Sequence, residues 1–395
     1  MNKIIGNVGL SADEILANGY NPERLSAIER HFERLVESEC IYGAAWCVAH
    51  KGNIIAKGAL GAGSGYDSAV NMTPDVSFRI ASLTKLLTAA AVMTLVEDGF
   101  IILDRPIAGY IKEFPFGDIT PYHLLTHTSG LHPDGGCFPD DNVPAWWDFI
   151  EDAVKIHGRD FDWIKAGLTA GRRRAPNTEW MYNTFGFIIL GEMITRVTGV
   201  DVHDYMAERI FKPIGMNSTS FEPIPALKNE FFAWKKEQRE RFDAIANGTF
   251  KEDDDDTTAV WNKIPRTGGG LFSTLEDLVK FGETCKNYGT AANGAHILGR
   301  PAVTVMTADH LFNIPEFCWG SQNRNRAYGI GFDKRRTLAF TLSDDSFSHE
   351  GAGPSALYVD RKADLTAAWF APWNKGEWCS DPLWNAQNVI WSGIM

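Results

Sequence analysis

The sequence predicts an α/β (α+β) fold in which an antiparallel sheet, flanked by terminal helices, carries an inserted and mainly helical subdomain. Two groups of strand-like segments lie far apart in the chain, at 44–58 and at 327–370. Between them, residues from about 82 to 220 show the apolar spacing of helices interrupted by loops. Strands near both ends with helices between them indicate one sheet that is assembled from both termini.

The first strands follow a helix. Residues 21–38 carry apolar side chains at helical spacing among charged ones. Residues 44–50 then predict a strand, 51–53 a turn, and 54–58 the hairpin partner of that strand. The glycine-rich stretch 61–65 lacks the Gly-Lys-Ser/Thr of a phosphate loop and precedes no helix, so we expect a flexible turn there.

The middle of the chain is predicted to be mostly helical. From Ser82 to Gly99 a broad apolar stripe predicts one helix, and residues 186–199 predict another that also ends at a glycine. Residues 221–264 form a polar insertion with scattered aromatic side chains and the acidic run Asp253–Asp256. We expect this insertion to be a solvated loop rather than a metal site, and a lid over a binding site is the second interpretation.

Short strand-like segments return near the end of the chain, at 327–332, 355–359 and 365–370. Residues 382–393 are compatible with a closing helix. These elements predict an N-terminal extension (1–20), a sheet subdomain (21–80 and 265–395) and a mainly helical subdomain (81–264).

Composition narrows the class of protein. The 395 residues are 44% hydrophobic and 22% charged, as in globular proteins, and the net charge is −12. An acidic balance opposes binding to nucleic acid or to an anionic membrane. No segment approaches the length of a membrane span, and the N-terminal apolar stretch is short and broken by glycine and asparagine. We therefore expect a cytoplasmic protein with neither nucleic acid nor a membrane as partner.

Metal and disulfide chemistry are not predicted. The six cysteines are scattered without a Cys-x-x-Cys pair, which favours reduced and mostly buried thiols. His123 and His127 have the spacing of two zinc ligands on a helix, but the glutamate of the His-Glu-x-x-His pattern is missing between them. The expected site holds no metal and no organic cofactor.

The segment Ser82-Leu83-Thr84-Lys85 carries the clearest chemical signal. A hydroxyl and an amine three residues apart at the start of a helix share one face. An oxygen nucleophile needs such a neighbour, because a free serine hydroxyl is almost never ionised at neutral pH. The helix N-terminus and burial both disfavour a charged lysine, so Lys85 is a candidate general base. The alternative is that Ser82 caps the helix and Lys85 is solvated.

Two further segments hold groups suited to the same chemistry. Tyr182 precedes a predicted helix, and a phenol beside an amine can relay a proton; alternatively it is a core or rim tyrosine. His349 can donate to a substrate carbonyl or carboxylate, and Gly351 lets the backbone approach closely. The backbone N–H of Ala352 is a candidate oxyanion donor, paired with that of Ser82. An ordinary glycine-rich turn is the alternative.

Together these motifs resemble the serine β-lactamase and penicillin-binding-protein superfamily. The similarity is greatest to its class C-like branch, which includes D-stereospecific peptidases, family VIII esterases and the statin side-chain acyltransferase. It runs from about residue 21 to the C-terminus and includes three linking segments: 123–131, 211–216 and 268–278. The resemblance implies a β-lactamase/transpeptidase-like fold with Ser82 as the acylated nucleophile, Lys85 as its partner and Tyr182 as the proton relay. Removal of the serine proton is assigned to the Lys85–Tyr182 pair jointly.

The sequence departs from the superfamily pattern at two places. The second motif is usually Tyr-x-Asn, whereas Thr184 follows Tyr182 and Asn183 here, so the amide that would contact a substrate carbonyl is missing from its place. The third motif of efficient class C β-lactamases is Lys-Thr-Gly, and His349 occupies the lysine position. That change removes a fixed positive charge, so we expect weak or no β-lactamase activity.

Most of the tryptophans are expected to be simply packed in the protein. Some are candidates to line an acyl or aromatic pocket, Trp319 or Trp373 before the others. The expected function is hydrolysis of an ester or amide through an acyl-enzyme, as in a carboxylesterase or a D-peptidase. An acyltransferase of secondary metabolism is the first alternative, and a ligand-binding or sensor relative without turnover is the second. The expected partner is a small-molecule ester or amide, and the oligomeric state is not predicted.

Overall fold

The computed structural model describes residues 2–6, 8–137, 144–158, 161–250, 261, 263–316, 318–320, 326–334, 341–374 and 381–395. Its larger sheet has the strand order β1-β3-β2-β10-β9-β8-β7-β6, and every pair of neighbours is antiparallel. The bounds are β1 Lys3–Ile5, β2 Gly43–His50, β3 Asn53–Gly61, β6 Ala327–Tyr328, β7 Asp333–Lys334, β8 Ser346–Gly351, β9 Ser355–Asp360 and β10 Leu365–Phe370. A separate pair joins β4 (Phe78–Arg79) to β5 (Phe272–Ser273).

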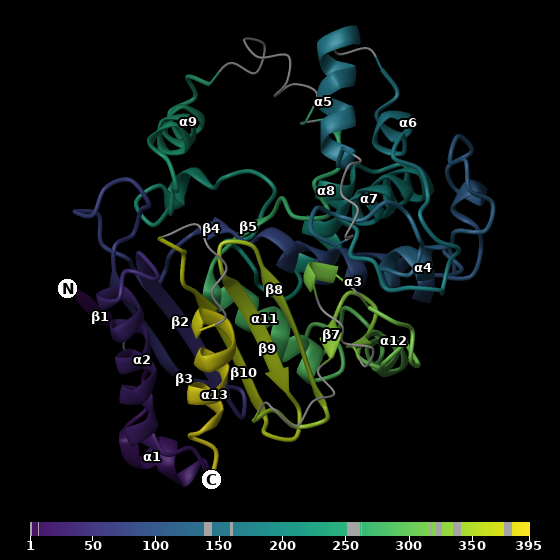
Figure 1. Cartoon of the computed structure of the whole chain (residues 1–395). Coiled ribbons are helices and arrows are strands. Elements are labelled where there is room, and N and C mark those ends of the chain that lie inside the picture. The colour runs from purple at the N-terminus through teal and green to yellow at the C-terminus, as the bar shows by residue number, and fades with distance from the viewer. Residues whose placement is uncertain are drawn as a thin grey trace.

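The sheet is assembled from both ends of the chain, as the sequence predicts. β2 from the N-terminal part pairs along its length with β10 from the C-terminal part, with Trp46 opposite Trp369. Figure 1 shows the first and last segments of the chain side by side on this sheet. The predicted fold class is therefore confirmed. β1 also joins the sheet, and the Tyr20 hydroxyl donates to the Ile390 carbonyl, so residues expected as an extension are docked onto the sheet.

Helices cover both faces of the sheet (Figure 1). α2 (Leu25–Glu37) and α13 (Ala386–Trp391) pack together on one face, and α11 (Leu275–Lys286) packs against β2, β9 and β10 on the other. The strands feed both layers because successive side chains point to opposite faces. On β10, Trp369 belongs to the cluster under α2 and α13, whereas Phe370 belongs to the larger core on the α11 side.

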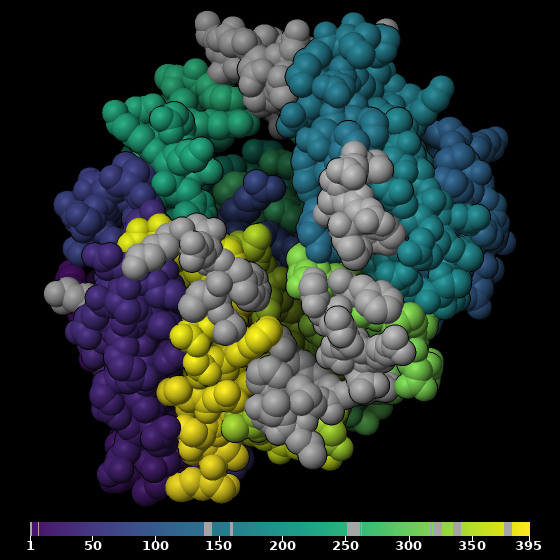
Figure 2. Space-filling view, viewed as in Figure 1, coloured from purple at the N-terminus to yellow at the C-terminus, as the bar shows by residue number. Residues whose placement is uncertain are grey.

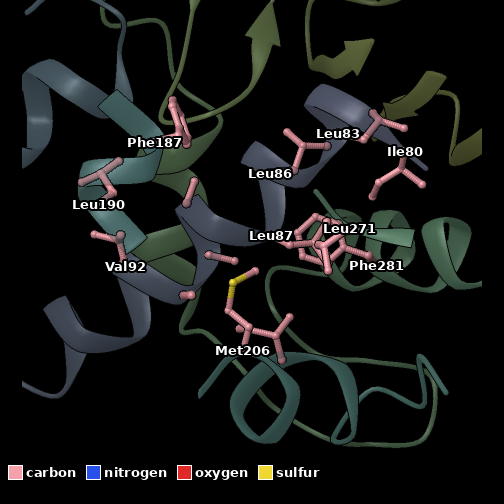
Figure 3. Packing of buried hydrophobic residues seen from close by; sticks show 14 of the residues in the cluster. Ile80, Leu83, Leu86, Leu87, Val92, Phe187, Leu190, Met206, Leu271 and Phe281 are labelled. Carbon is pink, nitrogen blue, oxygen red and sulfur yellow. The ribbon is translucent and has the colours of Figure 1, made fainter. Parts of the chain in front are cut away.

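Most of the remaining helices gather beyond one end of the sheet, and α12 lies beside its β7 edge (Figure 1). Their bounds are α3 Thr84–Glu97, α4 Pro121–Leu125, α5 Trp146–His157, α6 Trp163–Gly167, α7 Thr184–Thr198, α8 Val202–Met206, α9 Lys236–Ala246 and α12 Arg300–Met306, with α1 (Ala12–Ala17) near the N-terminus. α3 is buried almost all round, because its side chains from Thr84 to Leu95 meet neighbours on every side. Figure 3 shows Leu86, Leu87 and Val92 of α3 among side chains such as Phe187 and Met206.

The polar insertion is more ordered than a solvated loop. Its described part contains α9, and Phe232 and Phe242 are buried. Trp234 packs so closely on the turn after β8 that a β-carbon on Gly353 would lie 2.9 Å from its ring. Aromatic side chains spaced through the polar sequence anchor this segment, which the charge pattern alone does not reveal. The acidic run Asp253–Asp256 lies outside the described residues.

Two other local expectations need correction. The strand expected over 327–332 ends at Tyr328, because Gly331 has a positive φ of 78° and turns the chain toward β7. The glycine-rich segment at 348–354 is not only a turn, since β8 extends through Gly351. Among the described residues, no helix combines the length and the apolar character that crossing a bilayer would require.

Candidate active site

Ser82 lies in a single 3-10 turn, Ala81–Leu83, that leads directly into α3. Ala81 just before it has a positive φ of 47°, a conformation that L-residues rarely adopt. The neighbouring strand approaches this turn closely: a β-carbon on Gly351 would lie 2.4 Å from the Ile80 carbonyl oxygen. Gly351 therefore permits a close contact between β8 and the Ser82 turn, and the contact sets where Ser82 lies against the end of β8.

Lys85 is in the first turn of α3 and has no exposed surface. Its Nζ donates to the Gly268 carbonyl at 2.6 Å and lies 3.0 Å from Thr184 Oγ1 and 3.3 Å from Ser82 Oγ. Burial lowers the pKa of this amine to about 8, because the charged form loses its hydration. The interpretation of Lys85 as a solvated helix residue is therefore wrong.

Tyr182 lies two residues before α7 and is 8% exposed. Lys85 Nζ lies 4.8 Å from the centre of the Tyr182 ring, and the Ser82 side chain is near enough to the phenol to influence its pKa. Burial raises the pKa of the phenol well above its usual range, so Tyr182 is a neutral phenol at physiological pH. The structure thus brings the serine hydroxyl, the amine and the phenol together.

Asn183 and Thr184 have different roles at the start of α7: the first caps the helix and the second contacts Lys85. Asn183 caps the helix, because its Oδ1 accepts from the Gly186 N–H at 2.5 Å and its amide donates to the His132 carbonyl. It therefore points away from Lys85. Thr184, at the position where the usual Tyr-x-Asn motif has an asparagine, lies beside Lys85. Its hydroxyl donates to Asp134.

His349 on β8 is 6% exposed and its ring centre is 6.3 Å from that of Tyr182. Its Nδ1 lies 2.7 Å from the Glu350 carbonyl, which can only accept, so Nδ1 carries the hydrogen. Burial and the nearby Lys85 lower its pKa to about 4, so the ring is neutral and Nε2 presents a lone pair. The expectation that His349 donates to a substrate is corrected: in this tautomer its free nitrogen accepts.

The two candidate tryptophans have different surroundings. Trp319 is 55% exposed, and its ring centre lies 5.3 Å from that of Tyr182. Trp373 instead packs against the cluster under α2 and α13, on the opposite face of the sheet. The alternation that sends Trp369 and Ala371 into that cluster also sends Trp373 there. The structure does not bring Trp373 to the site.

The surface is hollowed above the strands, between the segment that carries α9 and the part that contains α5 and α7 (Figure 2). Ala352 is exposed in the turn that follows β8, one residue after the Gly351 contact with the Ser82 turn. This arrangement places the Ala352 backbone and the start of α3 as neighbours at the base of the site.

The structure places two further side chains, Asp134 and His127, near Lys85, and the sequence motifs give them no part in this chemistry. Asp134 lies in the loop after the 123–131 segment and binds the start of α7. His127 is fully buried, with its ring centre 4.4 Å from that of Tyr182, and its Nδ1 accepts from the Asn183 N–H at 3.1 Å. Neither residue stands at a recognisable spacing from Ser82, so only the fold reveals them.

Penicillin-binding proteins and esterases are among the known proteins that this chain resembles. Penicillin-binding protein 4 of Amycolatopsis lactamdurans is 27% identical over 289 residues, which span 70% of this chain and 68% of that protein. Esterase EstB of Burkholderia gladioli is 30% identical over 208 residues, so the match spans about half of each chain, 50% here and 51% of the esterase. The solved structure of EstCE1, described as a hydrolase with promiscuous acyltransferase activity, has a TM-score of 0.69 at 16% identity and covers 94% of this chain and 99% of its own.

The solved structure supports the fold, and the sequence matches extend over large parts of the chain. A model of the Beta-lactamase family matches residues 28–387, from the first sheet helix to the last one. That range includes all the elements that meet at Ser82, Lys85 and Tyr182. The chain therefore belongs to the beta-lactamase family.

Proposed function

We propose that this protein is a serine hydrolase that cleaves an ester or amide bond through an acyl-enzyme on Ser82. The observation that carries the proposal is the position of Ser82 Oγ, 3.3 Å from a buried amine and near the phenol of Tyr182. Relatives named as an esterase and as a penicillin-binding protein support acyl-serine chemistry.

The protonation states of Lys85 and Tyr182 determine which of them accepts and which of them donates a proton when Ser82 reacts. Lys85, whose pKa is about 8, supplies a lone pair near neutral pH and takes the Ser82 proton as Oγ bonds to the acyl carbon. Tyr182 holds its proton and gives it to the leaving oxygen or nitrogen as the bond from the acyl carbon breaks. The proton that Lys85 accepted then passes to Tyr182 and restores the phenol. In the second half of the reaction, water attacks the acyl carbon and gives a proton to this pair. The bond from the acyl carbon to Oγ breaks, and Ser82 recovers its proton from the pair.

The backbone N–H groups of Ser82 and Ala352 are proposed to stabilise the oxyanion, and the exposed ring of Trp319 to contact the acyl or leaving group. His349 bears on the choice of substrate. Because its ring is neutral, it offers no positive charge to the carboxylate of a β-lactam. We therefore propose weak or no β-lactamase activity and an ester or D-peptide as the substrate class.

The test is Ser82→Ala against the parent protein, using p-nitrophenyl esters, a D-peptide panel and a fluorophosphonate probe. The parent should turn over at least one ester, and intact mass should show one acyl or phosphonyl adduct at Ser82. The variant should lose both while its thermal unfolding stays unchanged. Turnover that survives in the variant would place the nucleophile elsewhere.

The same assay separates the alternatives. Addition of alcohol acceptors diverts the acyl group to a new ester if the protein is an acyltransferase. Stoichiometric labelling of Ser82 without turnover of any ester or peptide would indicate a sensor rather than an enzyme.

A further inference from the structure

Asp134 and Thr184 form a chain of hydrogen bonds that ends on Lys85. The Thr184 hydroxyl donates to Asp134 Oδ2, and its oxygen lies 3.0 Å from Lys85 Nζ. The other carboxylate oxygen, Oδ1, accepts from the Thr184 N–H at 2.9 Å and from the Trp146 indole N–H at 3.2 Å. Both of these donors are fixed, because an amide nitrogen and an indole nitrogen cannot accept.

The packing holds this chain in place. The Asp134 N–H donates to the Tyr182 carbonyl at 2.9 Å, and the Asn183 side chain donates to the His132 carbonyl, so the loop and the start of α7 are joined at two further points. A β-carbon on Gly268 would lie 2.5 Å from the Thr184 side chain, so Gly268 lets its own carbonyl and Thr184 meet at the same amine. The negative carboxylate also lies at the N-terminus of α7, where it is favoured.

The number of hydrogens on Lys85 Nζ determines the direction of each of its three hydrogen bonds. A neutral amine has two hydrogens and one lone pair. The Gly268 carbonyl takes one hydrogen because it can only accept. The Thr184 hydroxyl donates its hydrogen to the Asp134 carboxylate, so its oxygen accepts a hydrogen bond from the second N–H of Lys85. The lone pair is then left for Ser82, the third hydrogen-bond partner of Lys85 Nζ in the described part of the chain, at 3.3 Å.

We infer that Asp134, acting through Thr184, is a positioning residue that turns the lone pair of Lys85 toward Ser82. This inference rests on the proposed function, since it concerns the base of that reaction. Asp134 touches neither Ser82 nor the reacting atoms; it fixes the orientation of a hydroxyl that fixes the orientation of the amine. When Lys85 takes the serine proton, its three hydrogens match three oxygens without any neighbour turning.

The experiment compares Asp134→Asn, Thr184→Val and Thr184→Ser by the pH profile of fluorophosphonate labelling at Ser82. In Asp134→Asn the amide oxygen stays on the two fixed donors, so the amide NH₂ faces Thr184 and reverses its hydroxyl toward Lys85. We expect the plateau rate to fall about tenfold to a hundredfold, as for loss of a charge-assisted hydrogen bond. The midpoint of the profile should also move to lower pH, because the Asp134 charge favours the protonated amine.

Thr184→Val should lower the plateau by a similar factor while the midpoint moves less, because the charge remains. Thr184→Ser keeps the hydroxyl and should restore the parent rate. The double variant Asp134→Asn/Thr184→Val should be labelled no more slowly than the slower of its two single variants, because both substitutions break the same chain of hydrogen bonds. The other titratable groups around Lys85, namely Tyr182, His127 and His349, are unchanged in every variant.

Asp162→Asn is the matched control, because Asp162 caps α6 from an exposed position and an asparagine caps as well. Its profile should equal the parent profile. If the parent labels but Asp134→Asn and Thr184→Val keep its plateau and midpoint, the inference is overturned and the proposed function stands. If the parent is never labelled at Ser82, the proposed function itself fails. Should Asp134→Asn not fold, the contrast between Thr184→Val and Thr184→Ser decides.

Discussion

At the scale of single residues, the site depends on a lysine that has lost its hydration. Lys85 has no exposed surface, and its nitrogen is surrounded by the Gly268 carbonyl, two hydroxyls and the ring of Tyr182. Oxygen partners satisfy its hydrogens, so the amine can be buried without an ion pair of its own. Burial is what brings its pKa down into the range where a base is useful.

The rate of Ser82 acylation should follow the deprotonation of Lys85. The protonated amine has no lone pair, so below the pKa of about 8 the rate should fall about tenfold for each pH unit, and above it the rate should level off. Fluorophosphonate labelling from roughly pH 6 to 9.5 measures this profile. Tyr182→Phe is a useful companion: it should lower the rate but keep the midpoint, since the phenol stays neutral over this range. A flat parent profile would contradict the role of Lys85.

At the scale of elements, the site forms where the start of α3 meets the end of β8. Neither element holds the site alone: the 3-10 turn before α3 supplies Ser82, the first turn of α3 supplies Lys85, and β8 supplies His349 and the close contact at Gly351. Because helix and strand are each regular, the positions of the functional groups follow from where the two elements touch.

Gly351→Ala should force β8 and the turn that carries Ser82 apart. The new β-carbon would lie 2.4 Å from both the Ile80 carbonyl oxygen and Ser355 Oγ, so β8 or the Ser82 turn has to shift. We expect a loss of about 1–3 kcal/mol in the free energy of unfolding and a larger proportional loss of labelling at Ser82. Gly117→Ala is the control, because that β-carbon meets open space. Labelling at the parent rate in Gly351→Ala would show that the contact does not position Ser82.

At the scale of the whole molecule, the sheet separates two hydrophobic layers with different tasks. The cluster under α2 and α13 contains side chains from both termini and lies away from Ser82. The larger core, which includes most of α3, lies on the side of the site. A change in the first layer should therefore alter stability without altering chemistry.

Ile390→Ala tests this separation. Ile390 of α13 is fully buried, and its loss should cost about 2–4 kcal/mol in the free energy of unfolding, measured by urea denaturation. The rate of Ser82 labelling in the native state should stay at the parent value. Ile156→Ala, a substitution of a side chain 72% exposed on α5, should change stability by no more than about 0.5 kcal/mol. Slower labelling in folded Ile390→Ala would contradict the independence of the two layers.

Much of the fold is visible in the sequence where the pattern is strong and local. The hairpin of β2 and β3, the helix at α3 and the helix at α7 all lie close to their predicted ranges. The short strands β1 and β4 and the packed insertion are not visible, because a strand of two or three residues has no measurable period and its partner lies elsewhere in the chain. Trp373 was expected at the site but lies on the opposite face of the sheet. The reason is related, since the face on which it lies depends on the register of β10.

The sequence by itself determined that a hydroxyl and an amine stand one helical turn apart at Ser82 and Lys85, because an i, i+3 spacing is a property of the helix alone. Only the tertiary structure decided what surrounds them. The carbonyl that binds Lys85 comes 183 residues later, at Gly268, and the carboxylate that orients Thr184 comes from a loop 50 residues before it. Burial and the direction of a hydrogen bond arise from such distant contacts, so they appear when the chain folds.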